Sequence, residues 1–348
     1  MNENLARITK TISLICLSLN LILTPLFFLP FTTDFFGFNK LMLFLLLTAV
    51  SLVSWLVYNI ATKTVRLTLS PMLLPVFLLA TVAVISTLIN RPASPDTWIS
   101  NTAVYIAIFV YYLLATTLIQ TSTQVKTILN WLIITSTVLG LLGIFSVLGA
   151  FEGLSLPAYI INKGFSPTGS LLNLVGLLCL TLPLSLVFAF KSRLGPKKLQ
   201  YFLSSGIIIS ALILTGYQIL PNRPFSVILL PKLASWSIAV DTFKSNILFG
   251  AGPGNFITQF NRFKPLNLNL TNFWAANFNS SGNLYFHLMT TLGLTGILAF
   301  LFIIYSWYKL SKRDSGTRIT AIQLAINISL AVGFILGLFI PFTPLTWI

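Results

Sequence analysis

One short segment of the chain combines a cationic and an aromatic side chain at helical spacing. Residues 231–243 read PKLASWSIAVDTF, and the leading proline suits the first turn of a helix. Lys232 and Trp236 are four residues apart and therefore lie on one stripe of that helix. Two interpretations are open: an interfacial helix whose lysine reaches the headgroups beside the tryptophan, or a helix that holds Lys232 beside a phosphate-bearing lipid.

A glycine-rich turn follows, and after it a second pair of basic residues. The turn, residues 250–255, reads GAGPGN, and the short helical stretch behind it ends with Arg262 and Lys264. Gly252 and Gly254 permit a close approach of the backbone, so the turn either cradles a phosphate or simply joins two helices. Its spacing does not match a dinucleotide-binding fingerprint.

The rest of this polar region contains amides, hydroxyls and one more arginine. Residues 267–283 are rich in Asn and Ser and include Phe273 and Trp274, while Arg223 stands at the beginning of the region. Amide and hydroxyl groups beside aromatic rings suit a sugar, whose apolar face stacks on the rings. A solvated loop is the alternative.

Motifs for several other chemistries are absent from the sequence. There is no GxxxxGK[ST] loop, no HExxH motif and no Cys/His cluster, which argues against a P-loop ATPase and a zinc site. No two acids are close enough for a DxD-type metal site, and Cys16 and Cys179 lie in separate apolar runs. We therefore expect neither a metal nor a cofactor. No ionisable residue lies mid-span, which argues against coupled transport.

The elements that must position these groups follow from the composition. The 348 residues are 56% hydrophobic and only 8% charged, whereas a soluble domain has about a quarter charged residues. Long apolar runs predict an all-α, polytopic helical membrane protein rather than a barrel. We expect about nine transmembrane helices, at residues 11–30, 40–60, 70–89, 98–119, 127–150, 170–190, 201–220, 283–308 and 319–340.

The basic residues indicate the orientation of these helices. The net charge is +15, but the charges lie between apolar spans, which favours membrane orientation over nucleic-acid binding. With the N-terminus in the cytoplasm, thirteen of the 21 Lys and Arg residues face inward. The chain then divides into seven helices in 1–220, one large extracytoplasmic segment in 221–282, and two helices in 283–348.

The order of these pieces resembles the O-antigen ligase and polymerase family of bacterial envelope proteins. The likeness is carried by KLASW at 232–236, NILFGAGPGNF at 246–256, NLYF at 283–286 and LGLTGILAF at 292–300. Residues 24–40, with TPL, FTTD and then Lys40, are similar to the family's first outer loop.

Three positions depart from the family pattern. Lys232 stands where the family usually has an arginine, and a lysine lacks the planar fork that grips phosphate. Gly282 stands where the family has a histidine, and Thr291 where an acid is common. His287, the only histidine, lies beyond the motif position, and we expect it at the headgroups or packed at the top of the eighth helix.

The resemblance implies glycosyl transfer at the outer face of the cytoplasmic (inner) membrane. The donor would be a polyprenyl-diphosphate-linked glycan and the acceptor a lipid or a glycan, surrounded by membrane lipids and without nucleic acid, metal or cofactor. Basic residues would stabilise the departing diphosphate, and Asp241 is one candidate for the base. The expected substrate-binding residues are Arg223, Lys232, Trp236, Gly252, Gly254, Arg262, Lys264 and Asn283.

Two other functions stay open at this point. The chain could be a transporter of lipid-linked glycans in which the large segment acts as a gate. It could also be a non-catalytic relative that binds a lipid-linked glycan, because Lys232 and Gly282 replace the family's arginine and histidine.

Overall fold

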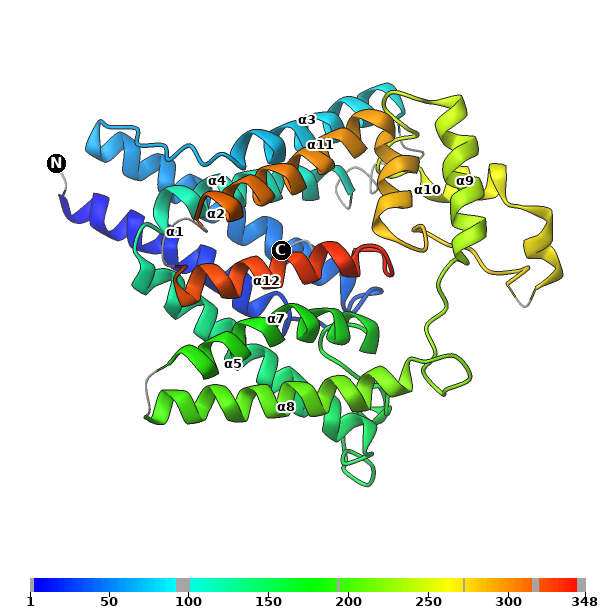
Figure 1. Cartoon of the computed structure of the whole chain (residues 1–348), viewed down its shortest axis with the longest axis horizontal. Coiled ribbons are helices and arrows are strands. Elements are labelled where there is room, and N and C mark those ends of the chain that lie inside the picture. The colour runs from blue at the N-terminus through cyan, green and yellow to red at the C-terminus, as the bar shows by residue number, and fades with distance from the viewer. Residues whose placement is uncertain (1–2, 92–100, 193–194, 272, 315–318, 343–348) are drawn as a thin grey trace.

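The protein is all-helical, as predicted. The computed structural model describes residues 3–91, 101–192, 195–271, 273–314 and 319–342, and within these ranges it contains helices and no strands. Figure 1 shows most of the helices running side by side, with α9 and α10 gathered at one end. The chain is therefore a helical bundle with a cap.

The bundle helices correspond to the nine predicted spans, as far as the described residues go. Six are long and apolar enough to cross a membrane, and α3, α4 and α12 are shorter apolar helices. Residues 98–100 of the fourth predicted span lie outside the described residues. The bounds are α1 (Glu3–Leu23), α2 (Gly37–Thr62), α3 (Leu73–Ile89), α4 (Ala103–Leu118), α5 (Ser122–Val147), α7 (Leu171–Lys191), α8 (Pro196–Gln218), α11 (Leu284–Asp314) and α12 (Ala321–Leu336).

Buried polar side chains join neighbouring helices of the bundle. Asn20 of α1 donates to the Phe44 carbonyl and the Thr48 hydroxyl of α2, at 3.2 and 3.0 Å. Trp307 of α11 donates to the Asn327 amide oxygen of α12 at 3.2 Å. Such bonds hold helices together in lipid, where apolar surfaces alone give little preference for one neighbour. Asn20 and Asn327 are therefore packing contacts between helices.

The first helix differs from its prediction by about two turns at each end. It begins at Glu3 and ends at Leu23, whereas the apolar run predicted 11–30. Thr24 and Pro25 begin a turn instead, because the carbonyls there bind the ammonium group of Lys40. Lys40 Nζ donates to the carbonyls of Thr24, Pro25 and Phe27 at 3.2, 3.1 and 2.6 Å. The polar residues before Thr11 extend the helix at its other end.

The helix at the predicted eighth span is kinked. α11 contains non-helical backbone at Gly293 (φ 65°, ψ −154°), and Figure 1 shows the orange ribbon turning sharply between α10 and the label of α11. A positive φ is a conformation that glycine adopts without steric cost. The residues before Gly293 therefore leave the direction of the bundle and run beside α9.

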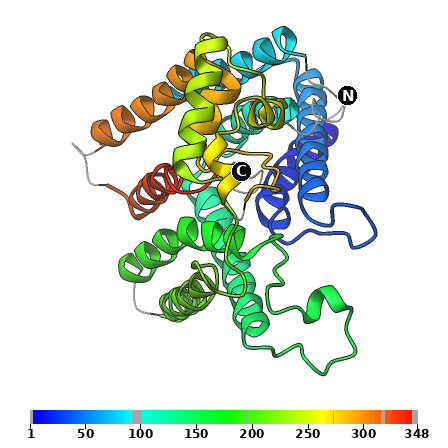
Figure 2. The same cartoon turned by 90° about the vertical axis from the view of Figure 1, so that its right-hand side faces the viewer.

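The cap is built from the predicted outer segment. It contains α9 (Lys232–Ser245), α10 (Phe256–Phe263) and a 3-10 helix at Leu266–Leu270. Figure 2, which looks onto this end, shows the yellow-green and yellow elements in front of the bundle. The segment between α5 and α7 carries α6 (Ala158–Ile161) and projects to another side. The predicted helix over 231–243 is confirmed.

Candidate functional site

α9 buries one face and leaves its cationic end exposed. The buried residues are Ala234, Ser235, Ile238, Ala239 and Thr242. Small side chains at this spacing form a narrow stripe that lets α9 lie close to its neighbours. Lys232 is in the first turn of the helix and exposed.

The side chains of Lys232 and Trp236 each contact a ring from the bundle. Lys232 Nζ lies 4.7 Å from the centroid of Phe339, just after α12. Trp236 is 50% exposed and stacks at a tilt against Phe286 of α11, with ring centroids 5.4 Å apart. The structure thus places a cation and an indole one turn apart, both reachable from outside, on a surface that we call the α9 face (Lys232, Trp236, Phe286 and Phe339).

An apolar cluster supports the cap from beneath. Phe256 and Phe260 of α10 are almost fully buried and pack with Ile238 of α9. Phe278 meets the Phe260 ring edge-on at 5.6 Å. Burying a phenylalanine contributes roughly 2 kcal/mol, so this cluster fixes α10 against α9 without any contribution from the polar loop residues.

Backbone hydrogen bonds connect the glycine turn to α11. Ala251 N and Gly252 N donate to the carbonyls of Thr290 and Thr291, both at 2.9 Å. In return, Leu294 N donates to the Ile247 carbonyl at 2.9 Å. The N–H groups of 251 and 252 therefore bind the kink of α11, which favours the simple turn over the phosphate cradle for these two residues.

Gly254 lies in the same turn, next to Asn255. The Asn255 amide donates to the carbonyls of Asn90 and Ala251 at 3.0 and 2.8 Å. A Cβ on Gly252 would lie 3.0 Å from the Asn90 carbonyl oxygen, and Gly252 has φ +97°. Gly252 is thus required by the close approach of the end of α3.

Two residues at the end of α3 bind the glycine turn, and no sequence motif indicates them. Ser86 Oγ lies 2.5 Å from the Phe249 carbonyl and 3.1 Å from the Thr291 carbonyl. The Asn90 amide donates to the Gly250 carbonyl at 2.9 Å. Their spacing of four residues, at the end of an apolar run, was the available signal, because it puts both side chains on one face.

The other predicted cations lie against rings of their own segments. Arg262 packs over Phe263 with its guanidinium carbon 5.0 Å from the ring centroid. Lys264 Nζ donates to the Trp274 carbonyl at 2.5 Å. Arg223, which follows α8, packs over Tyr217 at 4.0 Å and donates to the hydroxyl of that tyrosine. None of these contacts joins one predicted cation to another.

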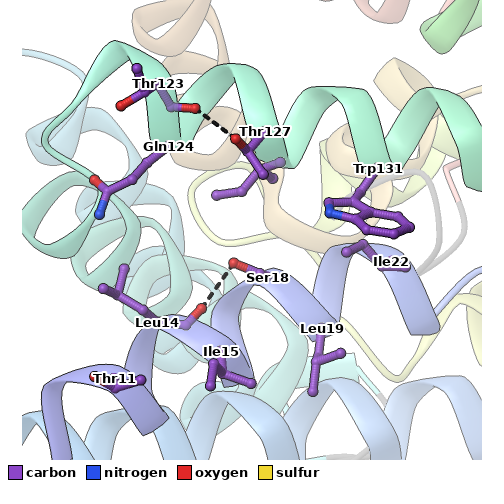
Figure 3. Close-up of a pocket in the computed structure, with 11 residues that line it drawn as sticks. Thr11, Leu14, Ile15, Ser18, Leu19, Ile22, Thr123, Gln124, Thr127 and Trp131 are labelled. Carbon is purple, nitrogen blue, oxygen red and sulfur yellow. Dashed lines mark hydrogen bonds between the residues drawn. The ribbon is translucent and has the colours of Figure 1, made fainter.

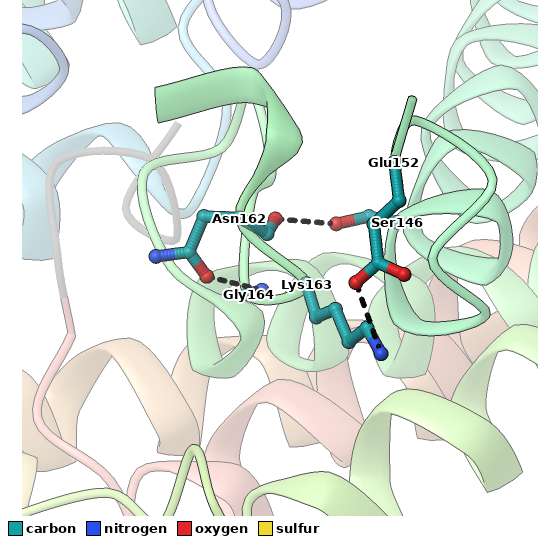
Figure 4. A network of polar contacts seen from close by, with 5 residues as sticks. All are labelled: Ser146, Glu152, Asn162, Lys163 and Gly164. Carbon is teal, nitrogen blue, oxygen red and sulfur yellow. Dashed lines mark hydrogen bonds and ion pairs between the residues drawn. The ribbon is translucent and has the colours of Figure 1, made fainter. Parts of the chain in front are cut away.

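Two acids of the segments between the bundle helices form ion pairs. The candidate base Asp241 accepts from Lys244, one turn away on α9, at 3.4 Å, and both side chains are well exposed. Glu152 pairs with Lys163 at 3.0 Å in the loop after α5, beside the contact of Ser146 with the Asn162 carbonyl (Figure 4). These pairs lower the net charge available from Lys244 and Lys163.

The motif around Asn283 has a structural role. The Asn283 side-chain oxygen accepts from Phe286 N at 2.8 Å, which caps the start of α11. A Cβ on Gly282 would lie 2.3 Å from the Leu230 carbonyl oxygen, so a histidine does not fit there. His287 packs against Phe256 at 5.4 Å, and its Nδ1 faces Ser281 N at 3.4 Å. His287 therefore packs at the top of α11, one of its two expected positions.

The cavity shown in Figure 3 contains none of the predicted site residues. It holds about 590 Å³ between α1 and α5, and apolar side chains such as Leu14, Leu19 and Trp131 line it. The hydroxyls of Ser18 and Thr127 donate to carbonyls of their own helices, at 2.9 Å each. A groove with an apolar lining between membrane helices suits a lipid chain.

The described residues contain no group of three or more His, Cys, Asp or Glu that could hold a metal ion. No protein-family model and no curated protein sequence matches this chain.

Proposed function

We propose that this membrane protein binds a polyprenyl-diphosphate-linked glycan at the α9 face and transfers the glycan to a lipid or glycan acceptor, in the manner of an O-antigen ligase or polymerase. The observation that carries the proposal is the pairing of Lys232 with Trp236, one helical turn apart and both exposed. An ammonium group attracts a phosphate, and an indole ring covers the apolar face of a sugar.

The position of the α9 face suits a substrate with a membrane anchor. Lys232 lies beside Phe339 and Trp236 beside Phe286, and these rings belong to segments that continue into α12 and α11. A polyprenyl chain would lie among the bundle helices, while the diphosphate and the first sugars would reach the cap. On this proposal the cap faces the outside of the cytoplasmic membrane.

The proposed reaction exchanges one glycosidic partner for another. The bond between the anomeric carbon and the diphosphate oxygen breaks, and the acceptor hydroxyl forms a new bond to the same carbon. The carrier leaves as polyprenyl diphosphate, whose developing charge Lys232 stabilises. The hydroxyl proton leaves to a base or to solvent, and the described cap offers Asp241 for this step only after its pair with Lys244 opens.

A second function, binding without transfer, is favoured by the structure around Gly282. A Cβ at that position would lie 2.3 Å from the Leu230 carbonyl oxygen and 2.9 Å from Ser235 Oγ. The chain therefore excludes a side chain where the resembled family carries its histidine. If that histidine is needed for transfer, this protein retains only the recognition of a lipid-linked glycan.

Purified protein in nanodiscs, mixed with a synthetic polyprenyl-diphosphate glycan and an acceptor glycan, separates the two functions. Release of polyprenyl diphosphate measures transfer, and binding of a fluorescent donor measures recognition. We expect Lys232→Gln to weaken donor binding about tenfold, the scale of one charge-assisted contact. Trp236→Ala should weaken it by a similar factor.

Lys244→Gln is the matched control, because Lys244 is on the same helix and 72% exposed but pairs with Asp241. Binding that falls with Lys232→Gln and not with Lys244→Gln supports the α9 face. Equal donor binding by the wild type, Lys232→Gln and Lys244→Gln would rule out the α9 face as the donor site. Donor binding by the wild type without release of polyprenyl diphosphate would rule out glycan transfer and leave recognition of the lipid-linked glycan as the function.

A further inference from the structure

At the end of the bundle away from α9, four helix ends surround a second cavity. It holds about 690 Å³. α8 and α12 begin at this end, the left-hand end in Figure 1, whereas α9 and α10 lie at the right-hand end. The start of α5 and the last residue of α7 complete the wall. We call this cavity the basic pocket.

Three lysines from three different helices line the basic pocket. They are Lys126 of α5, Lys191 of α7 and Lys197 of α8, and all three are exposed. No acidic side chain is among the residues described as lining it. Three cations that converge on one cavity without a counter-charge repel one another, and a bound anion relieves that repulsion.

The backbone adds to the positive potential in the pocket. α8 begins at Pro196 with Gly195 before it, and no side chain caps its first turn. A Cβ at Gly195 would meet nothing within 4 Å, so the start of α8 opens directly into the cavity. Pro196 has no N–H, and Lys198 N and Leu199 N donate to the Gly195 carbonyl, so α8 contributes mainly through its dipole, whose positive end is at the helix start. This dipole supplements the lysines, which carry the main charge.

The floor of the basic pocket is apolar. Phe188 and Ile322 line it together with the lysines, and both belong to the apolar cluster formed by α5, α7, α8 and α12. Next to it, Phe190 and Leu199 are 69% and 61% exposed, as expected for side chains that face lipid. A free anion gains nothing from such a floor, whereas a phospholipid has both a charged headgroup and an apolar body.

We infer that the basic pocket binds the phosphate-bearing headgroup of an anionic phospholipid, with the glycerol and the first methylenes against Phe188 and Ile322. The three lysines bind the phosphate and favour a headgroup with a net negative charge. A zwitterionic phospholipid has the phosphate but not the net charge. The site is separate from the α9 face and does not depend on the proposed function. It would anchor the ends of α5, α7, α8 and α12 to one leaflet.

Native mass spectrometry of the detergent-purified full chain tests this inference, with phosphatidylglycerol and phosphatidylcholine as probes. We expect the wild type to retain phosphatidylglycerol in preference to phosphatidylcholine. Replacing one lysine, as in Lys126→Gln, Lys191→Gln or Lys197→Gln, should weaken retention about fivefold, and the triple variant on the order of 100-fold. These residues are exposed, so folding should be unaffected, which thermal unfolding of each variant checks.

Lys198→Gln is the matched control. Lys198 neighbours Lys197 on α8, but its ammonium group packs over Phe202 at 5.8 Å and it does not line the pocket. Retention that is unchanged in Lys198→Gln and lost in the triple variant supports the site. Equal loss in the control and in Lys197→Gln would overturn it, because the charge would then act without a defined site. Displacement of the lipid by an equal concentration of inorganic phosphate would overturn the role of the apolar floor.

Discussion

Gly250 of the cap and Gly293 of α11 lie back to back with almost no space between their backbones. A Cβ on Gly250 would be 2.6 Å from the backbone nitrogen of Gly293, and a Cβ on Gly293 would be 2.5 Å from that of Gly250. Both residues have a positive φ, 62° and 65°. The turn before α10 and the kink of α11 therefore depend on each other, and this contact fixes the position of the cap.

Gly250→Ala and Gly293→Ala should each destabilise the protein by about 2–3 kcal/mol, because both add overpacking and a strained backbone. Thermal unfolding in detergent, followed by intrinsic fluorescence, measures the change. Gly206→Ala is the control, since Gly206 is within α8 and a Cβ there would meet nothing within 4 Å. That control should be neutral or slightly more stable. A wild-type unfolding temperature for Gly293→Ala would contradict the described contact.

The contact also shows what the sequence could not predict. The run 283–308 is mostly apolar, and isolated glycines such as Gly293 and Gly296 in such a run are compatible with a continuous helix. The kink at Gly293 arises because Ala251 and Gly252, some forty residues earlier, donate to carbonyls just before it. A periodicity argument considers one segment at a time, so it misses a bend that two distant segments make together.

The candidate site, too, could be predicted only in part from the sequence. The helix with Lys232 and Trp236 was predictable, because a proline start and spacing four residues apart are local features. Its exposed face was not, because that depends on Phe286 and Phe339, which come from segments far along the chain. The role of the Asp241 carboxylate could not be predicted from the sequence either, because only the structure shows that it forms an ion pair with Lys244.

Gly282→Ala should also lower stability, here by about 2 kcal/mol, because the new methyl group meets the Leu230 carbonyl and Ser235 Oγ. Gly282→His, which would restore the residue of the resembled family, should be more damaging still and should not increase glycan transfer. Gly216→Ala in α8, where a Cβ has free space, is the control. Higher transfer by a folded Gly282→His protein would show that the histidine does fit and would reverse this conclusion.

Lys40 is the clearest case of a buried charge with a structural task. Its side chain is 3% exposed, and Nζ donates to four carbonyls: those of Thr24, Pro25 and Phe27, and that of Pro167 at 2.7 Å. The four bonds tie the turn after α1 to the segment before α7, which is 127 residues away from Lys40. A hydrogen bond to a charged group contributes roughly 1.5–3 kcal/mol.

Lys40→Met keeps the length and the apolar stem of the side chain but removes the ammonium group, whose three N–H donors serve the four carbonyls. We expect a loss of about 3 kcal/mol, because four buried carbonyls lose their partner. Hydrogen exchange should rise in residues 24–36 and 162–170, the two segments that Lys40 joins, and should stay unchanged in α8. Lys244→Met, at an exposed lysine with one surface ion pair, is the control and should change stability by less than about 1 kcal/mol. Equal stability of the two variants would mean that the hydrogen bonds from Lys40 to the four carbonyls contribute nothing to the stability of the protein. A loss confined to Lys40→Met, with faster exchange in both segments, would identify Lys40 as the tie between the turn after α1 and the segment before α7.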